Sequence, residues 1–218
     1  MIDNKQKNSQ VRQKKSKPSI TEMSTLIYGI MAAVGIGFCL WSHQNFWNLV
    51  SIPGDSATAT KLLTITGLGL GVLLIGSYFF ESWFKSFRDA RMSMMTLLGN
   101  ISVLESFYLA FLSSVGEEFL FRGAILPSAG IYFSSILFGL LHIGPKGFIS
   151  SWSIWATLSG LLLALIVEST GSILPAITIH FIVNAVSILL IRRDWLRLSE
   201  TEQKNLKKKI TELETQEL

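Results

Sequence analysis

Long runs of residues without any Asp, Glu, Lys or Arg alternate, along this chain, with short segments in which these charged residues gather. The uncharged runs lie at 23–54, 62–80, 123–145, 147–167 and 169–191. An apolar stretch of about 18 or more residues is typical of a helix that spans a membrane. The pattern therefore predicts an all-α fold, a polytopic transmembrane helix bundle.

Turn-forming residues and polar segments divide these runs into separate helices. The predicted spans lie at about 24–41, 62–80, 93–127, 131–143, 149–168 and 172–191. At about 1.5 Å per residue, the third predicted span (93–127) is longer than a hydrocarbon core of about 30 Å. We therefore expect a break near Gly99 and Asn100, with the residues before it lying in the membrane interface. A further turn is expected from Pro127 to Gly130. The bundle then has about six spans, or seven if 93–127 splits.

The pattern predicts one domain with four regions. They are a basic flexible tail (1–22), two leading transmembrane helices (23–92), a helical core with most of the buried polar residues (93–191) and an amphipathic C-terminal tail (192–218). In that last tail, Leu206, Ile210 and Leu213 recur at i, i+4 and i+7, which is typical of a helix on a membrane surface. The first 22 residues lack the apolar core and cleavage site of a signal peptide, so we expect an uncleaved first helix.

Composition and charge agree with a membrane protein and argue against a nucleic-acid partner. The 218 residues are 49% hydrophobic and 16% charged, whereas soluble domains are about 25% charged. Of the 19 Lys and Arg residues, six lie in 1–17 and seven in 192–209, beside the predicted spans. The net charge of +4 then reflects contact with membrane lipids and the positive-inside rule, which puts both termini of a six-span chain in the cytoplasm. Basic tails of this kind indicate a bacterial cell membrane or an organellar membrane.

Three charged residues lie close together at membrane depth: Glu117, Glu118 and Arg122. A charge at the bilayer centre costs about 2.5–3.5 kcal/mol on insertion scales, so such residues pair with each other or line a functional cavity. On a helix Glu118 and Arg122 are i and i+4 and can pair, whereas Glu117 is rotated by about 100° and lacks that partner. Glu117 is then free to act as a base. The alternative is that both acids only hold helices together.

Two histidines and an asparagine follow in the later apolar stretches. His142 and His180 lie on separate predicted spans, and each could be a base, a metal ligand or a hydrogen-bonded core residue. Together with the buried acids they indicate one shared site. Asn184 lies one turn after His180 on the same face, and its amide can donate to a developing oxyanion.

The chain lacks the motifs of several other hydrolases and of nucleotide-binding proteins. It contains no Gly-x-Ser-x-Gly, no His-Glu-x-x-His and no phosphate-binding glycine loop. Hydrolysis by activated water, with Glu117 as the base, fits these residues best.

Three ordered motifs resemble those of the CPBP (Abi) family of intramembrane proteases, which includes the type II CAAX prenyl proteases and bacteriocin-processing or immunity proteins. The motifs are Glu117-Glu118-x-x-x-Arg122, Phe138-x-x-x-His142 and His180-x-x-x-Asn184. The resemblance covers about residues 93–191 and identifies them as a catalytic core. It implies three roles: Glu117 and His142 activate water, His180 and Asn184 hold the oxyanion or complete the site, and Glu118 and Arg122 support it.

The resemblance leaves the cofactor open. The family is named as metalloproteases, and a metal-free glutamate mechanism is also argued for its members. Glu117, His142 and His180 would make a zinc set of two histidines and one carboxylate, and they would equally serve without a metal.

The function implied by the resemblance is that of an endopeptidase. It would hydrolyse peptide bonds of membrane-associated or lipidated peptides or proteins with water activated by glutamate and histidine. One alternative is a non-catalytic membrane scaffold or bacteriocin-immunity protein with the same fold. Another is an ion-coupled carrier, which also uses buried Glu and His, although the chain has no internal repeat of the kind common in carriers.

Overall fold

The computed structural model describes residues 18–42, 46–51, 54–142 and 150–216; the greater part of the predicted basic tail, 1–17, lies outside them. All regular elements among these residues are helices, which confirms the predicted all-α class. They are α1 (Ile20–Trp41), α2 (Phe46–Val50), α3 (Ser56–Trp83), α4 (Lys85–Leu98), α5 (Val103–Glu118), the π-helix η1 (Phe119–Ile125), α6 (Leu126–Leu141), α7 (Ser151–Thr170), α8 (Leu174–Arg197) and α9 (Glu200–Gln216).

Polar residues cap the starts of several helices. Ser19 and Ser102 each form a capping box with a glutamate three residues later, Glu22 and Glu105 respectively. Asp55 caps α3 through its side chain. Such caps satisfy backbone N–H groups that have no partner in the first turn of a helix.

Five stretches of the described residues are long and apolar enough to cross a membrane: Ile20–Trp41, Ser56–Trp83, Val103–Leu141, Ser151–Thr170 and Leu174–Arg197. Large apolar side chains point outward from the first two, as Leu26 (65% exposed) and Leu63 (74% exposed) illustrate. Exposed apolar surface on this scale is uncommon in soluble proteins. The structure thus indicates a multi-pass membrane protein, with five such stretches where the sequence predicts about six spans.

The difference in number arises because the third stretch reverses direction at Gly130. This residue has φ 81° and ψ 170°, a conformation that glycine adopts readily and other residues rarely. Beyond it, Ser134 Oγ donates to the carbonyl oxygen of Phe121 (3.1 Å), and the rings of Phe121 and Phe138 are 5.0 Å apart. The last part of α6 therefore runs back along η1. The two arms of this stretch correspond to the third and fourth predicted spans, and the turn predicted between them is confirmed.

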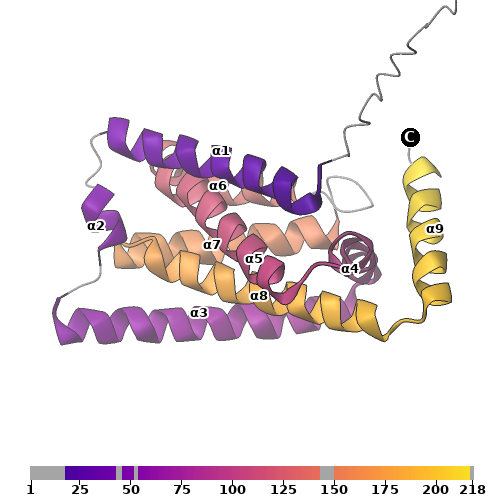
Figure 1. Ribbon diagram of the computed structural model, residues 1–218. Coiled ribbons are helices and arrows are strands. Elements are labelled where there is room, and N and C mark those ends of the chain that lie inside the picture. Colours follow the sequence, from indigo (N-terminus) through magenta and orange to yellow (C-terminus); the bar gives the residue numbers. More distant parts are fainter. Residues whose placement is uncertain (1–17, 43–45, 52–53, 143–149, 217–218) are drawn as a thin grey trace, which may run out of the picture.

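A break separates α4 from α5 at Gly99 and Asn100, as the sequence predicts. α4 buries Phe87, Ala90 and Met95 on one side. In Figure 1 it is seen end-on, across the direction of the long helices, and α9 stands at the same end of the bundle. This orientation is that of a helix lying along a membrane surface.

The predicted amphipathic C-terminal helix is α9. Its Ile210 is buried, and Leu206 packs against a cluster formed by Met95, Ile191 and Trp195. The apolar side of α9 is thus covered by α4 and α8, and Lys207 lies over the ring of Trp195, with Nζ 5.3 Å from its centroid.

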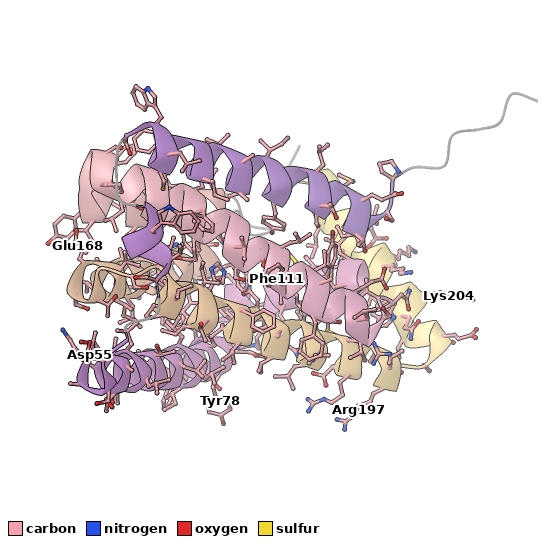
Figure 2. The ribbon with its side chains drawn as sticks, turned by 60° about the vertical axis from the view of Figure 1, so that its left-hand side comes forward. Asp55, Tyr78, Phe111, Glu168, Arg197 and Lys204 are labelled. Atoms are coloured by element: carbon pink, nitrogen blue, oxygen red, sulfur yellow. The ribbon has the colours of Figure 1, made fainter. Side chains whose placement is uncertain are left out.

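The charged residues labelled in Figure 2 lie at the two opposite ends of the bundle. Figure 2 shows Asp55 and Glu168 at one end, and Arg197 and Lys204 at the other. The start of α1 and the end of α8 both lie at the end marked by the basic residues (Figure 1). The chain therefore returns to the end from which α1 starts.

Glycines let α1 pack against α5 and η1 with their backbones almost in contact. A Cβ atom at Gly35 would overlap the carbonyl group of Phe119, and one at Gly116 would come within 2.6 Å of the Tyr28 carbonyl oxygen. Gly37, on the same helix, has open space around it. Membrane helices commonly use small residues for such close approach.

We predict that Gly35→Ala lowers the thermal stability of the full chain in detergent, because the added methyl group meets backbone atoms that can move only if α1 separates from η1. Overpacking of this kind costs about 1–3 kcal/mol. Gly37→Ala is the control and should unfold at the temperature of the parent. Identical unfolding temperatures for the two variants would contradict the close contact of α1 with η1.

Candidate active site

The two adjacent acids lie where α5 passes into the π-helix η1. Glu117 and Glu118 are the last residues of α5, and both are buried, Glu118 completely. Arg122 lies within η1 and is also buried. π-Helical segments are rare and frequently occur at functional sites. This junction is therefore the natural centre of the candidate site.

Arg122 compensates the charge of Glu118 and ties neighbouring helices to it. Its Nη1 donates to Glu118 Oε1 (2.8 Å), and its Nη2 donates to the carbonyl oxygen of Gly160 on α7 (2.9 Å). The guanidinium also lies over the ring of Phe138, with Cζ 4.6 Å from the centroid, a favourable cation–π contact. One buried side chain thus links η1 to α5, α6 and α7.

Glu118 in turn orients His180 on α8. The Nδ1 atom of His180 lies 2.7 Å from Glu118 Oε1. A carboxylate only accepts hydrogen bonds, so Nδ1 carries the proton and the Nε2 of the neutral ring presents a lone pair. That Nε2 lies 3.8 Å from Glu117 Oε2.

His142, directly after α6, approaches the same oxygen. Its Nδ1 lies 2.7 Å from the carbonyl oxygen of Phe138. A carbonyl oxygen also only accepts, so this ring has the same tautomer as His180. Its Nε2 lies 3.8 Å from Glu117 Oε2.

The Oε2 atom of Glu117 is the point at which both rings converge. It is buried and has no hydrogen-bond partner within the described part of the chain. The two 3.8 Å separations exceed a hydrogen-bond length of about 2.7–3.2 Å and suit a bridging water. Because all three atoms are acceptors, a molecule that donates protons, such as water, satisfies them best.

A cavity of about 250 Å³ lies beside the histidines, with walls from α3, α4, α7 and α8. His142, His180 and Asn184 line it, and most of the other lining side chains are apolar. Glu117 is not among the lining residues. The structure thus brings three of the four predicted residues to one cavity and puts Glu117 behind the two histidines.

Asn184 is held in the cavity wall by a serine that the sequence analysis missed. Its Nδ2 donates to Ser113 Oγ (2.9 Å), and the second N–H of the amide is available to a ligand. Ser113 is buried on α5. Its spacing of four residues before Glu117, on the same helix face, is the signal that could have identified it. The backbone carbonyl of Gly160, which accepts from Arg122, could not have been identified from the sequence, because every residue has a backbone carbonyl.

The structure gives no support for the possible zinc set of Glu117, His142 and His180. Within the described residues, no group of three or more His, Cys, Asp or Glu is arranged to hold a metal ion. The 3.8 Å separations between donor atoms also exceed the edge of about 3.3 Å that follows from zinc bonds of about 2.0–2.1 Å in a tetrahedral site.

Replacing Arg122 with alanine is expected to destabilise the fold, because Glu118 then remains as a buried carboxylate without its ion-pair partner. Breaking a buried pair in this way costs about 3–5 kcal/mol. Thermal unfolding and yield of the purified chain measure the loss. Arg193→Ala is the control, since the side chain of Arg193 is 52% exposed and pairs with Asp194. An Arg122→Ala protein as stable as this control would contradict the structural role of the pair.

Comparisons with known proteins agree with the motifs. Residues 99–186 match the family model described as type II CAAX prenyl endopeptidase Rce1-like. The chain is 30% identical, over 104 residues, to the uncharacterized protein YpbD of Bacillus subtilis (strain 168); the alignment covers 47% of this chain and 53% of YpbD, so the chain spans about half the length of that relative. No solved structure gives a significant match. Residues 99–186 of this chain therefore form an Rce1-like type II CAAX prenyl endopeptidase domain of the CPBP (Abi) family.

Proposed function

We propose that this chain is an intramembrane endopeptidase that hydrolyses peptide bonds of membrane-associated or lipidated peptides with activated water. The observation that carries the proposal is the buried Glu117 Oε2, which lies 3.8 Å from the Nε2 atoms of both His142 and His180. Ionisable groups inside membrane proteins are costly and generally functional. The endopeptidase family to which the domain belongs supports the same type of reaction.

In the proposed reaction Glu117 is the general base. A water held between its Oε2 and the histidines gives a proton to the carboxylate while its oxygen attacks the carbonyl carbon of the peptide bond. When the carbon–nitrogen bond breaks, the protonated Glu117 returns the proton to the departing amine. General acid–base catalysis of this kind contributes about 10²–10⁴-fold to a rate.

The histidines hold the water and respond to the charge that develops. His180 is kept in one orientation by Glu118, whose Oε1 is 2.7 Å from Nδ1. If a proton reaches the Nε2 of His180 during the reaction, that same carboxylate stabilises the imidazolium, as in other oriented histidine–carboxylate pairs. Arg122 donates to the same carboxylate oxygen (2.8 Å) and so holds Glu118 in place beside His180.

Asn184 is the proposed oxyanion donor, and the cavity is the proposed substrate site. Asn184 lines the same cavity as the histidines, and the N–H that does not donate to Ser113 can donate to the carbonyl oxygen as negative charge builds up. The largely apolar walls favour an apolar side chain or lipid chain of the substrate next to the bond that is cut.

The alternatives account less well for these polar residues. A non-catalytic scaffold or immunity protein has no need for a buried carboxylate oxygen that faces two histidines and has no hydrogen-bond partner within the described residues, because burying such a group is unfavourable. An ion-coupled carrier could use the same groups. In that case Glu117→Gln would abolish ion flux in proteoliposomes and leave every peptide in the membrane unchanged.

We further propose that both termini face the cytoplasm of a bacterial cell. The relative in Bacillus subtilis is bacterial. The start of α1 shares one end of the bundle with Arg197 and Lys204 (Figures 1 and 2), and basic residues near spans remain on the cytoplasmic side.

This orientation predicts that a reporter fused after Leu218 is cytoplasmic. Green fluorescent protein at that position should fluoresce, and alkaline phosphatase at the same position should be inactive, because the first matures in the cytoplasm and the second only outside it. Fusions in the loop between α2 and α3, at the opposite end of the bundle (Figure 1), should give the reverse result. Active phosphatase after Leu218 would contradict the orientation.

The central prediction concerns Glu117→Gln, which keeps the shape of the side chain but cannot accept the proton. Peptidase activity should fall by about 10²–10⁴-fold, while the unfolding temperature stays near that of the parent. Membranes that contain the parent or the variant are compared by mass spectrometry, and peptides produced only by the parent identify substrates. Glu168→Gln, an exposed carboxylate at the end of α7, is the control and should keep full activity.

The same assay in a chelating buffer tests the role assigned to the side chains. Peptidase activity that persists in the chelating buffer supports a mechanism without a metal ion.

Full peptidase activity in the Glu117→Gln protein would overturn the proposed function.

A further inference from the structure

Two hydrogen bonds between side chains join α5 to α8, which lie side by side (Figure 1). At the end of α5, Glu118 Oε1 lies 2.7 Å from the Nδ1 atom of His180. Earlier on α5, Ser113 Oγ accepts from Asn184 Nδ2 at 2.9 Å. Each bond thus connects a residue of α5 to a residue of α8 that lines the cavity.

The hydroxyl group of Ser113 both donates and accepts. It donates its proton to the carbonyl oxygen of Ala110, 3.1 Å away, so its oxygen presents lone pairs to Asn184. An atom that only accepts at this point selects the NH₂ end of the amide. Because Ser113 is buried, its hydrogen bonds are electrostatically stronger than they would be in water.

An asparagine amide needs such a partner if it is to stabilise an oxyanion. Its last torsion is broad and roughly two-fold, so a rotation exchanges the NH₂ group with the carbonyl oxygen. An N–H that faces the developing oxyanion stabilises it, whereas an oxygen in the same place would repel it. Asn184 makes no other hydrogen bond within the described residues. The bond to Ser113 is therefore the contact that decides which end of the amide is held in place.

We propose that Ser113 is a positioning residue for the peptidase reaction: its oxygen holds the amide nitrogen of Asn184, so that an N–H of the amide serves the oxyanion. This inference rests on the proposed function, with Asn184 as the oxyanion donor. Ser113 precedes Glu117 by one turn on the same face of α5. One helix then carries both the base and the acceptor that orients the oxyanion donor.

The next residue supplies a matched control. Ser114 is also buried, and its hydroxyl also donates to a carbonyl oxygen of the preceding turn, that of Phe111 (2.9 Å). Unlike Ser113, it accepts no hydrogen bond from Asn184. Alanine at either position removes the same kind of local bond, and only Ser113→Ala also removes the acceptor of the amide.

The test compares the parent with Ser113→Ala, Ser114→Ala and Asn184→Ala as full chains in proteoliposomes. The probe is an internally quenched peptide made from a segment that parent membranes cleave and Glu117→Gln membranes leave intact. Asn184→Ala should lower kcat by about 10²–10³-fold. Ser113→Ala should lower it by about 10- to 100-fold, because a misplaced group loses part of its effect. KM should not change in Ser113→Ala, since Ser113 does not line the cavity. Ser114→Ala should keep both constants.

A double variant separates positioning from a general effect on the fold. If Ser113 acts through Asn184, adding Ser113→Ala to Asn184→Ala should lower kcat no further, because the amide that the serine orients is already absent. A merely structural role predicts instead that the losses in kcat multiply in the double variant. Multiplied losses would overturn the positioning role.

A second measurement does not depend on turnover. In chains with isotope-labelled asparagine, the side-chain NH₂ signal that Asn184→Ala removes from the magnetic resonance spectrum belongs to Asn184. Ser113→Ala should shift this signal, since amide protons respond to the loss of a hydrogen-bond acceptor. Ser114→Ala should leave it in place.

The outcomes separate the two proposals. An unchanged kcat or an unchanged amide signal in Ser113→Ala overturns the role of Ser113, even if Glu117→Gln is inactive. Full activity of Glu117→Gln, or a parent that cleaves no peptide, counts against the peptidase function, and the amide signal then decides whether Ser113 still holds Asn184.

Discussion

The ion pair between Glu118 and Arg122 is the interaction on which the site depends. Each partner also makes a second contact, since Glu118 orients His180 (2.7 Å) and Arg122 binds the carbonyl of Gly160 (2.9 Å). Segments from α5, η1, α7 and α8 thus meet at two side chains. A different packing of α7 or α8 would remove the contacts of this buried pair with Gly160 and His180, and buried polar groups that lose partners are costly. The pair therefore favours the observed arrangement of α7 and α8, in which His180 is turned toward Glu117.

Close helix contacts complete the frame around this pair. Gly35 and Gly116 bring α1 against η1 and α5, and Gly139 brings α6 against Thr157 of α7. Lipid provides little hydrophobic drive for helix association, so membrane helices rely on such close packing and on buried polar contacts. Small residues and the buried ion pair thus act together: the first allow the backbones to approach, and the second specifies which faces meet.

Local sequence rules predicted much of the fold. The uncharged runs located the long helices, because length and hydropathy decide whether a segment can span a membrane. The break at Gly99 and the turn before Gly130 followed from residues that interrupt helices. The structure has five continuous apolar stretches where the sequence predicted about six spans. The reason is that α5, η1 and α6 follow one another without a gap, although the chain reverses direction within α6. The π-helical form of η1 was not predictable, because no local pattern distinguishes it from an α-helix.

The sequence by itself determined which chemistry is present: two adjacent acids, an arginine one turn away, and two histidines and an asparagine on other spans. Spacing within one helix also indicated that Arg122 can reach Glu118, because residues four apart share a face. Only the tertiary structure decided that His142 and His180 point their Nε2 atoms at one oxygen of Glu117, 3.8 Å away. It also decided that Ser113 on α5 holds the amide of Asn184 on α8. Such contacts join residues far apart in the chain, and their geometry depends on how whole helices pack, which no local spacing records.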